Sequence, residues 1–160
     1  MLRLEVDGEH ANIKFSACHF IAGHDKCGRL HGHSYIISLK LYGETTEGGM
    51  IMDFVAVKKA LRDIADELDH RVLIPSNSNK ITVSVSDEVV VLSGCKKYIF
   101  PVDDVVLLDT KESSAEELAS CLLGRFIQMV KLPPNIIRVE LGIHEELGQS
   151  AWAGMDLAPR

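Results

Sequence analysis

The chain has 160 residues, of which 46% are hydrophobic and 25% are charged, and its formal net charge is −6. This composition is typical of a globular protein, and we expect residues 1–160 to form a single domain. The acidic balance and the lack of a lysine or arginine run argue against a nucleic-acid-binding protein. The sequence has no apolar leader and no apolar run of 18 residues, so we expect a cytoplasmic protein without a membrane span.

Hydrophobic periodicity predicts both strands and helices along the chain. Alternation of apolar and polar residues predicts strands at residues 2–6, 12–17, 33–42 and 136–143, with a short last strand at 150–154. Apolar residues at helical spacing predict a first helix that Asp53 caps and that ends near Asp69. A second helix begins at Ser114, which forms a capping box with Glu117, and Pro133 stops it.

The segment between the two helices has the character of β-structure. Four short apolar runs, ITVSV, EVVVL, YIF and VVLL, lie within residues 80–108 and are separated by polar residues, Gly or Pro. The element order is therefore two strands and a longer strand, a helix, short strands, a second helix and two strands. This order predicts an α+β fold with an antiparallel sheet.

A cluster of potential metal ligands lies between residues 15 and 35, which contain four histidines and two cysteines. His31 and His33 alternate on one face of a predicted strand, and His19 lies at the end of the strand before it. Antiparallel pairing of these strands would bring three imidazoles together, which is the ligand set of a catalytic zinc site with one open position. The alternative is that the H-x-H pattern is only a polar strand end.

Cys27 is the candidate reactive thiol because Lys26 and Arg29 flank it, and nearby positive charge favours a thiolate. The alternative is a small loop cysteine without a function. Asp69 and His70 follow the first helix, and a histidine beside a carboxylate can transfer protons. The same pair could equally be a favourable interaction of histidine with the helix dipole. The sequence alone gives no indication that Asp69 and His70 lie near Cys27.

Glu145 follows the predicted strand 136–143 in phase with the apolar residues of that strand. A carboxylate on a buried face needs a partner, because an unpaired buried charge is costly. A ligand with paired N–H donors would supply one. Alternatively the glutamate is exposed at the strand end, which is the expectation for Glu146.

The segments FSACH, CGRLHGH, GMIMDF, LDH and SSAEELA follow one another in the chain, and together with a strand that ends in glutamate they resemble the 6-pyruvoyltetrahydropterin synthase / 6-carboxytetrahydropterin synthase family. The resemblance implies the tunnelling fold, a four-stranded antiparallel sheet with two helices on one face, here with a β-hairpin inserted at about residues 74–109. It also implies a homo-oligomer, usually a hexamer, in which subunits join their sheets into a barrel and active sites lie between subunits.

The resemblance further implies three groups of site residues. Zinc would be bound by His19, His31 and His33. The catalytic triad, assembled across a subunit boundary, would be Cys27, Asp69 and His70. The pterin substrate would be anchored by Glu145, with Ser114 and Glu116 near the same pocket. Lys26 and Arg29 are candidates for binding a triphosphate.

The substrate implied by the resemblance is 7,8-dihydroneopterin triphosphate, and two reactions are open. Loss of triphosphate with internal redox gives 6-pyruvoyltetrahydropterin, whereas further cleavage with release of acetaldehyde gives 6-carboxytetrahydropterin for the queuosine or archaeosine pathway. The three-residue gap between Cys27 and His31 resembles the carboxy-forming enzymes, so we expect that reaction. A zinc-containing pterin-binding protein and a zinc hydrolase are the remaining alternatives. Ser113, Glu117 and Glu146 depart from the family's usual proline, asparagine and threonine.

Overall fold

The computed structural model describes residues 1–157, which form two sheets and two α-helices. The larger sheet contains β1 (Leu2–Val6), β2 (Lys14–His19), β3 (His31–Gly43), β4 (Arg71–Pro75), β8 (Val105–Leu108), β9 (Ile136–Glu145) and β10 (Ser150–Asp156). The smaller sheet contains β5 (Thr82–Val85), β6 (Glu88–Ser93) and β7 (Lys96–Pro101). The helices are α1 (Phe54–Leu68) and α2 (Ala115–Met129), and a 3₁₀ turn lies at Val102–Asp104. Neither described α-helix has the length and apolar character needed to cross a membrane.

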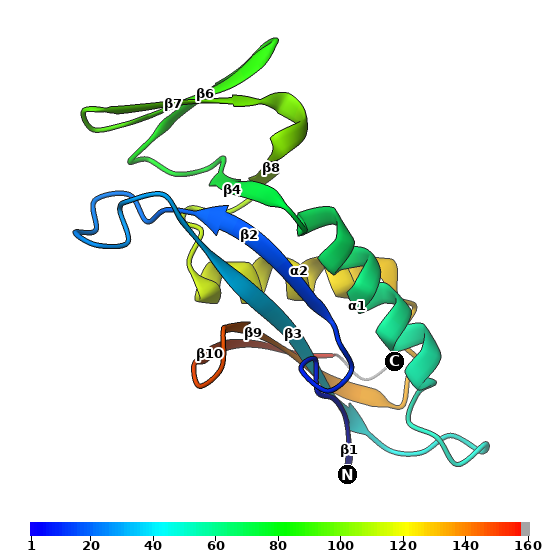
Figure 1. Cartoon of the computed structure of the whole chain (residues 1–160). Helices are drawn as coiled ribbons and strands as arrows, with labels where there is room; N and C mark the ends of the chain where they lie inside the picture. The colour runs from blue at the N-terminus through cyan, green and yellow to red at the C-terminus, as the bar shows by residue number, and fades with distance from the viewer. Residues whose placement is uncertain (158–160) are drawn as a thin grey trace.

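The antiparallel part of the larger sheet has four strands in the order β10-β9-β3-β2, and the short strand β1 also pairs antiparallel with β3. Both helices lie across one face of this sheet, and the main hydrophobic core fills the space between the layers (Figure 1). The predicted α+β arrangement, with a four-stranded antiparallel sheet and two helices on one face, is therefore confirmed. Strand β2 begins two residues later than predicted, because Asn12 adopts a left-handed turn conformation with φ of 53°.

The central strand β3 is buried on one face and partly covered on the other. Its helix-facing residues are fully buried, namely Tyr35, Ile37, Leu39 and Leu41. On the other face Ser38 is also buried, because the turn between β1 and β2 folds over it and the Gly8 amide donates to the Ser38 hydroxyl at 3.0 Å. A side chain at Gly8 could not fit, since its Cβ would lie 2.0 Å from the Ile37 carbonyl oxygen.

Both helices begin at the predicted caps. The Asp53 carboxylate accepts from the Val55 amide at 2.8 Å, and the Ser114 hydroxyl accepts from the Glu117 amide at 3.4 Å. The capping box is only half formed, because the Glu117 carboxylate accepts from the Lys111 amide instead. The apolar residues of α1 that recur at helical spacing are Phe54, Val57, Leu61, Ile64 and Leu68. All of them are buried except Phe54, which is 49% exposed.

The segment between the helices is larger than the predicted hairpin. Strands β4 and β8 extend the main sheet beyond β2 through parallel pairing. The three strands β5, β6 and β7 form a separate antiparallel sheet that projects from this edge (Figure 1). All three strands share a second hydrophobic cluster, in which Val89 and Val91 of β6 are buried with Phe20, and Val83 of β5 and Tyr98 of β7 pack against them.

The Asp53 cap gives a test of the fold. Asp53→Ala should lower the free energy of unfolding by about 1 kcal/mol, because the amides at the start of α1 lose their acceptor. Asp53→Asn retains a side-chain acceptor and should stay close to the unsubstituted protein. Urea unfolding at one fixed protein concentration measures the difference, and equal loss in both variants would contradict the role of the cap.

Candidate functional site

Three histidines come together where β2 and β3 pair. His19 lies directly opposite His31, and His33 lies opposite Ala17, so all three imidazoles project from the same face of the sheet. Their ring centroids are 4.6 to 5.2 Å apart. One ligand atom from each ring lies within 4.8 Å of the other two, and the cluster could therefore bind a metal ion.

The contacts around the histidines leave nitrogen atoms free for a cation. Nδ1 of His19 donates to the Ser113 carbonyl and Nδ1 of His31 donates to the Arg29 carbonyl, each at 2.7 Å. Because a carbonyl only accepts, each bond fixes the tautomer with an unprotonated Nε2. Nε2 of His19 and Nδ1 of His33 are buried without a hydrogen-bond partner among the described residues. Such orphaned nitrogens fit a metal ion well.

The protonation of His19 suits the same role. Burial lowers its pKa to about 4, although the bond to the Ser113 carbonyl acts in the opposite direction. The imidazole is therefore neutral near pH 7 and presents a lone pair, as a metal ligand must.

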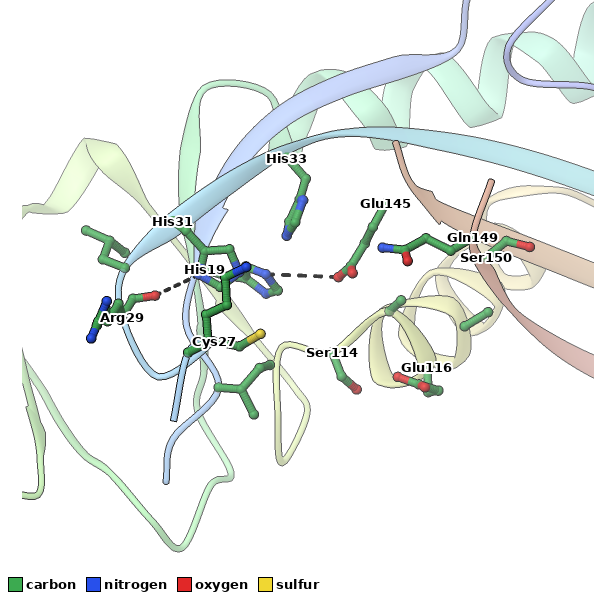
Figure 2. Close-up of a pocket in the computed structure, with 15 residues that line it drawn as sticks. His19, Cys27, Arg29, His31, His33, Ser114, Glu116, Glu145, Gln149 and Ser150 are labelled. Carbon is green, nitrogen blue, oxygen red and sulfur yellow. Dashed lines mark hydrogen bonds and ion pairs between the residues drawn. The ribbon is translucent and has the colours of Figure 1, made fainter. Parts of the chain in front are cut away.

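The histidines line a cavity of about 750 Å³. Its walls also include Lys26, Cys27, Arg29, Ser114, Glu116, Glu145, Gln149 and Ser150. Figure 2 shows Arg29 and the carboxylate of Glu145 on opposite sides of the histidines, and it shows the Cys27 sulfur pointing into the cavity. A volume of this size suits a small organic ligand.

Glu145 lies at the end of β9, where its Oε1 is 4.0 Å from Nε2 of His19. The predicted orientation is confirmed, because the side chain is 21% exposed and faces the cavity (Figure 2). Glu146, which adopts a left-handed backbone with φ of 64°, is 66% exposed and points instead towards Nδ1 of His33 at 3.6 Å. The two neighbouring glutamates therefore have different surroundings.

Cys27 lies on a tightly wound loop and is half-buried. Its carbonyl accepts from the Ile21 amide at 2.7 Å, and its amide donates to Nδ1 of His24 at 3.1 Å. His24 thus stabilises the loop, a role that the sequence did not indicate. Lys26 and Arg29, which flank the cysteine, also line the cavity and give this wall positive charge.

Asp69 and His70 form the predicted pair, with Oδ2 of Asp69 2.8 Å from Nδ1 of His70. Oδ1 of Asp69 accepts from the Ser16 amide at 2.7 Å, and this bond holds the pKa of the carboxyl below its usual range. Among the described residues, however, neither member of the pair lines the cavity that contains Cys27. His70 lines a second hollow together with His33 and with Cys18, and Cys18 projects from the opposite face of β2 to His19.

Two residues behind the histidines were not recognised from the sequence as part of the site. Ser113 is fully buried, and besides holding His19 it donates through Oγ to the Phe20 carbonyl at 3.0 Å. Tyr35 is fully buried beneath His19 and His33, with ring centroids at 5.9 and 5.5 Å. Burial raises the pKa of the Tyr35 phenol, which is therefore neutral. The alternation along β3 is the one sequence pattern that places Tyr35 on the same face as the histidines. No sequence pattern indicates that Ser113 contacts His19.

Comparison with known proteins agrees with this geometry. A family model described as 6-pyruvoyl tetrahydropterin synthase matches residues 10–154. A Methanocaldococcus jannaschii protein whose provisional name is 6-carboxy-5,6,7,8-tetrahydropterin synthase is 36% identical, with 94% of each chain covered. A Pyrococcus horikoshii protein with the same provisional name is 32% identical, with 92% of this chain and 89% of the relative covered.

A solved structure extends the comparison to the fold. The crystal structure of 6-pyruvoyl tetrahydropterin synthase from Plasmodium vivax superposes with a TM-score of 0.90 at 28% identity, and 98% of each chain is covered. The agreement of the family model, the relatives and the fold leads to one conclusion. The chain belongs to the 6-pyruvoyl tetrahydropterin synthase family.

Proposed function

We propose that this protein is a zinc-dependent 6-carboxy-5,6,7,8-tetrahydropterin synthase. It converts 7,8-dihydroneopterin triphosphate to 6-carboxytetrahydropterin with release of acetaldehyde and triphosphate, a step towards queuosine or archaeosine. The observation that carries the proposal is the single cavity that His19, His31, His33, Cys27 and Glu145 line together. The names of the M. jannaschii and P. horikoshii relatives support the same reaction.

The charges on the cavity wall support the choice of substrate. Glu145 accepts hydrogen bonds from the amino group and ring N–H of the pterin, and such charge-assisted bonds fix its orientation. Lys26 and Arg29 lie on the loop that lines the other side of the cavity and attract the triphosphate. Ser114 and Glu116 lie at the start of α2 on the cavity wall and contact the substrate there.

The histidine trio and the thiol supply the chemistry. His19, His31 and His33 would hold a zinc ion, which would supply Lewis acidity to the hydroxyl oxygens of the substrate side chain and make the neighbouring C–H more acidic. Cys27, as a thiolate, takes the proton from that carbon. His70, oriented by Asp69, returns a proton to the substrate. Within residues 1–157, Asp69 and His70 do not line the cavity that contains Cys27 of the same chain. A neighbouring subunit of a homohexamer would therefore contribute this pair.

A second reaction is 6-pyruvoyltetrahydropterin synthesis, which eliminates triphosphate without releasing acetaldehyde. The likeness to the P. vivax enzyme favours it, since that protein is described as a 6-pyruvoyl tetrahydropterin synthase. The short gap between Cys27 and His31 and the names of the relatives favour the carboxy-forming reaction. The products distinguish the two.

The metal is tested by elemental analysis. The purified protein should contain about one zinc per chain, and His31→Ala should lose most of it because two imidazoles hold zinc weakly. His10→Ala is the matched control, since His10 is exposed and paired with Asp7 far from the cluster in β2 and β3. Metal-free purified protein, or equal zinc in both variants, would contradict the zinc site.

The reaction is tested with 7,8-dihydroneopterin triphosphate and mass spectrometry of the products. We expect 6-carboxytetrahydropterin with acetaldehyde, and a loss in kcat of roughly 100-fold or more for Cys27→Ala, which lacks the base. Cys95→Ala changes an exposed cysteine outside the cavity wall and should leave kcat unchanged. A pyruvoyl product would overturn the carboxy assignment, and activity indifferent to Cys27→Ala would favour a zinc hydrolase.

The shared active site is tested by complementation. Cys27→Ala and His70→Ala should each be inactive alone, whereas their co-expression should restore activity at roughly a quarter of the sites through random pairing of subunits. Activity in such mixed oligomers can come only from sites that combine Cys27 of one copy with His70 of another. Mixed oligomers as inactive as each variant alone would rule out the shared site.

A further inference from the structure

The small sheet of β5, β6 and β7 packs against the loop that carries Cys27 (residues 20–30, the Cys27 loop). The Tyr98 ring of β7 stacks on Phe20 with centroids 5.1 Å apart and an interplanar angle of 24°. Phe20 and Ala22 are buried in one cluster with Val89 and Val91 of β6. In Figure 1 the turn between β6 and β7 and the Cys27 loop lie on the same side of the molecule. The base of the Cys27 loop is therefore anchored in this sheet.

A single side chain from the small sheet reaches further along the loop. Nζ of Lys96, the first residue of β7, donates to the Gly28 carbonyl at 2.7 Å, across 68 residues of sequence. An ammonium donor makes a stronger hydrogen bond to a carbonyl than a neutral donor does. This bond ties the loop to the sheet immediately after Cys27.

Gly28 is poorly able to move or to find another partner. It is buried, its amide donates to the His24 carbonyl at 3.0 Å, and a Cβ on it would lie 2.1 Å from that carbonyl oxygen. The carbonyls of Ile21, His24, Lys26 and Cys27 accept from amides within the loop. The Gly28 carbonyl instead accepts from outside the loop, and a buried carbonyl without a donor is costly.

The position of this bond connects the two reactive parts of the site. Gly28 follows Cys27 directly, and the carbonyl of the next residue, Arg29, orients His31 through a bond of 2.7 Å to Nδ1. Lys96 thus holds the peptide that lies between the thiol and a ligand histidine. Lys96 itself does not line the cavity in the described part of the chain, so its contact is with the loop and not with a substrate.

We propose that Lys96 is a positioning residue, through which the small sheet sets the place of the Cys27 sulfur relative to the histidine trio. This inference rests on the proposed function, because it assigns the small sheet a role in that reaction. It predicts an effect on turnover greater than the effect on substrate binding, since the cavity wall itself is unchanged.

The test compares Lys96→Met, which keeps the aliphatic stem but loses the donor, with Lys97→Met on the next residue of β7. Lys96→Met should raise amide hydrogen exchange in residues 20–30 and lower kcat, each by roughly tenfold, with KM within about twofold and zinc content unchanged. Lys97→Met should match the unsubstituted protein in all four measurements. Lys96→Arg retains a charged donor and should restore most of both the protection and the turnover.

Two results would overturn the inference. Exchange in the Cys27 loop that is equal in Lys96→Met and Lys97→Met would show that the bond does not hold the loop. Raised exchange with normal kcat would show that the bond is structural only. If the unsubstituted protein makes no pterin product, the proposed function fails, and hydrogen exchange still decides whether Lys96 holds the loop.

Discussion

The antiparallel register of β2 and β3 is the constraint from which the site follows. His19 pairs with His31, so the alternation of a strand puts both imidazoles, and His33 two residues on, on one face. A slip by one residue would turn His19 to the opposite face and leave two histidines without their third partner. The same face continues into Tyr35 and Ile37, where the helices cover it. Burial of the core thus enforces the register that brings the three histidines together.

The parts of the site that sequence could predict are those governed by local periodicity. His31 and His33 are two residues apart on one strand, and Glu145 is in phase with the apolar residues of its own strand. Asp53 and Ser114 cap their helices through amides two or three residues away. Each of these relations is visible in a short window of sequence, because strand and helix geometry fix it before any tertiary contact forms.

The remaining features depend on contacts between distant residues that carry no local signal. Ser113 holds His19 across 94 residues, and Lys96 reaches Gly28 across 68. The parallel pairing of β4 with β2 and β8 was also not foreseen, because a short apolar run such as VVLL carries no information about the direction of the strand or its partner. The three apolar runs of the small sheet were recognised in the sequence, but their packing was not. Val89 and Val91 of β6 are buried in one cluster with Phe20, which lies on a segment that no pattern connects to them.

Under the proposed function, the separation of Cys27 from His70 within one chain gives a chemical reason for the protein to form oligomers. The thiol lines the cavity that contains the histidine trio, whereas His70 lines a second hollow with Cys18, and His33 lines both. If Cys27 takes the proton and His70 returns it, as proposed, two copies of the chain would have to meet for both steps to occur at one site. Activity would fall on dilution to the point where subunits dissociate, even if each chain stayed folded.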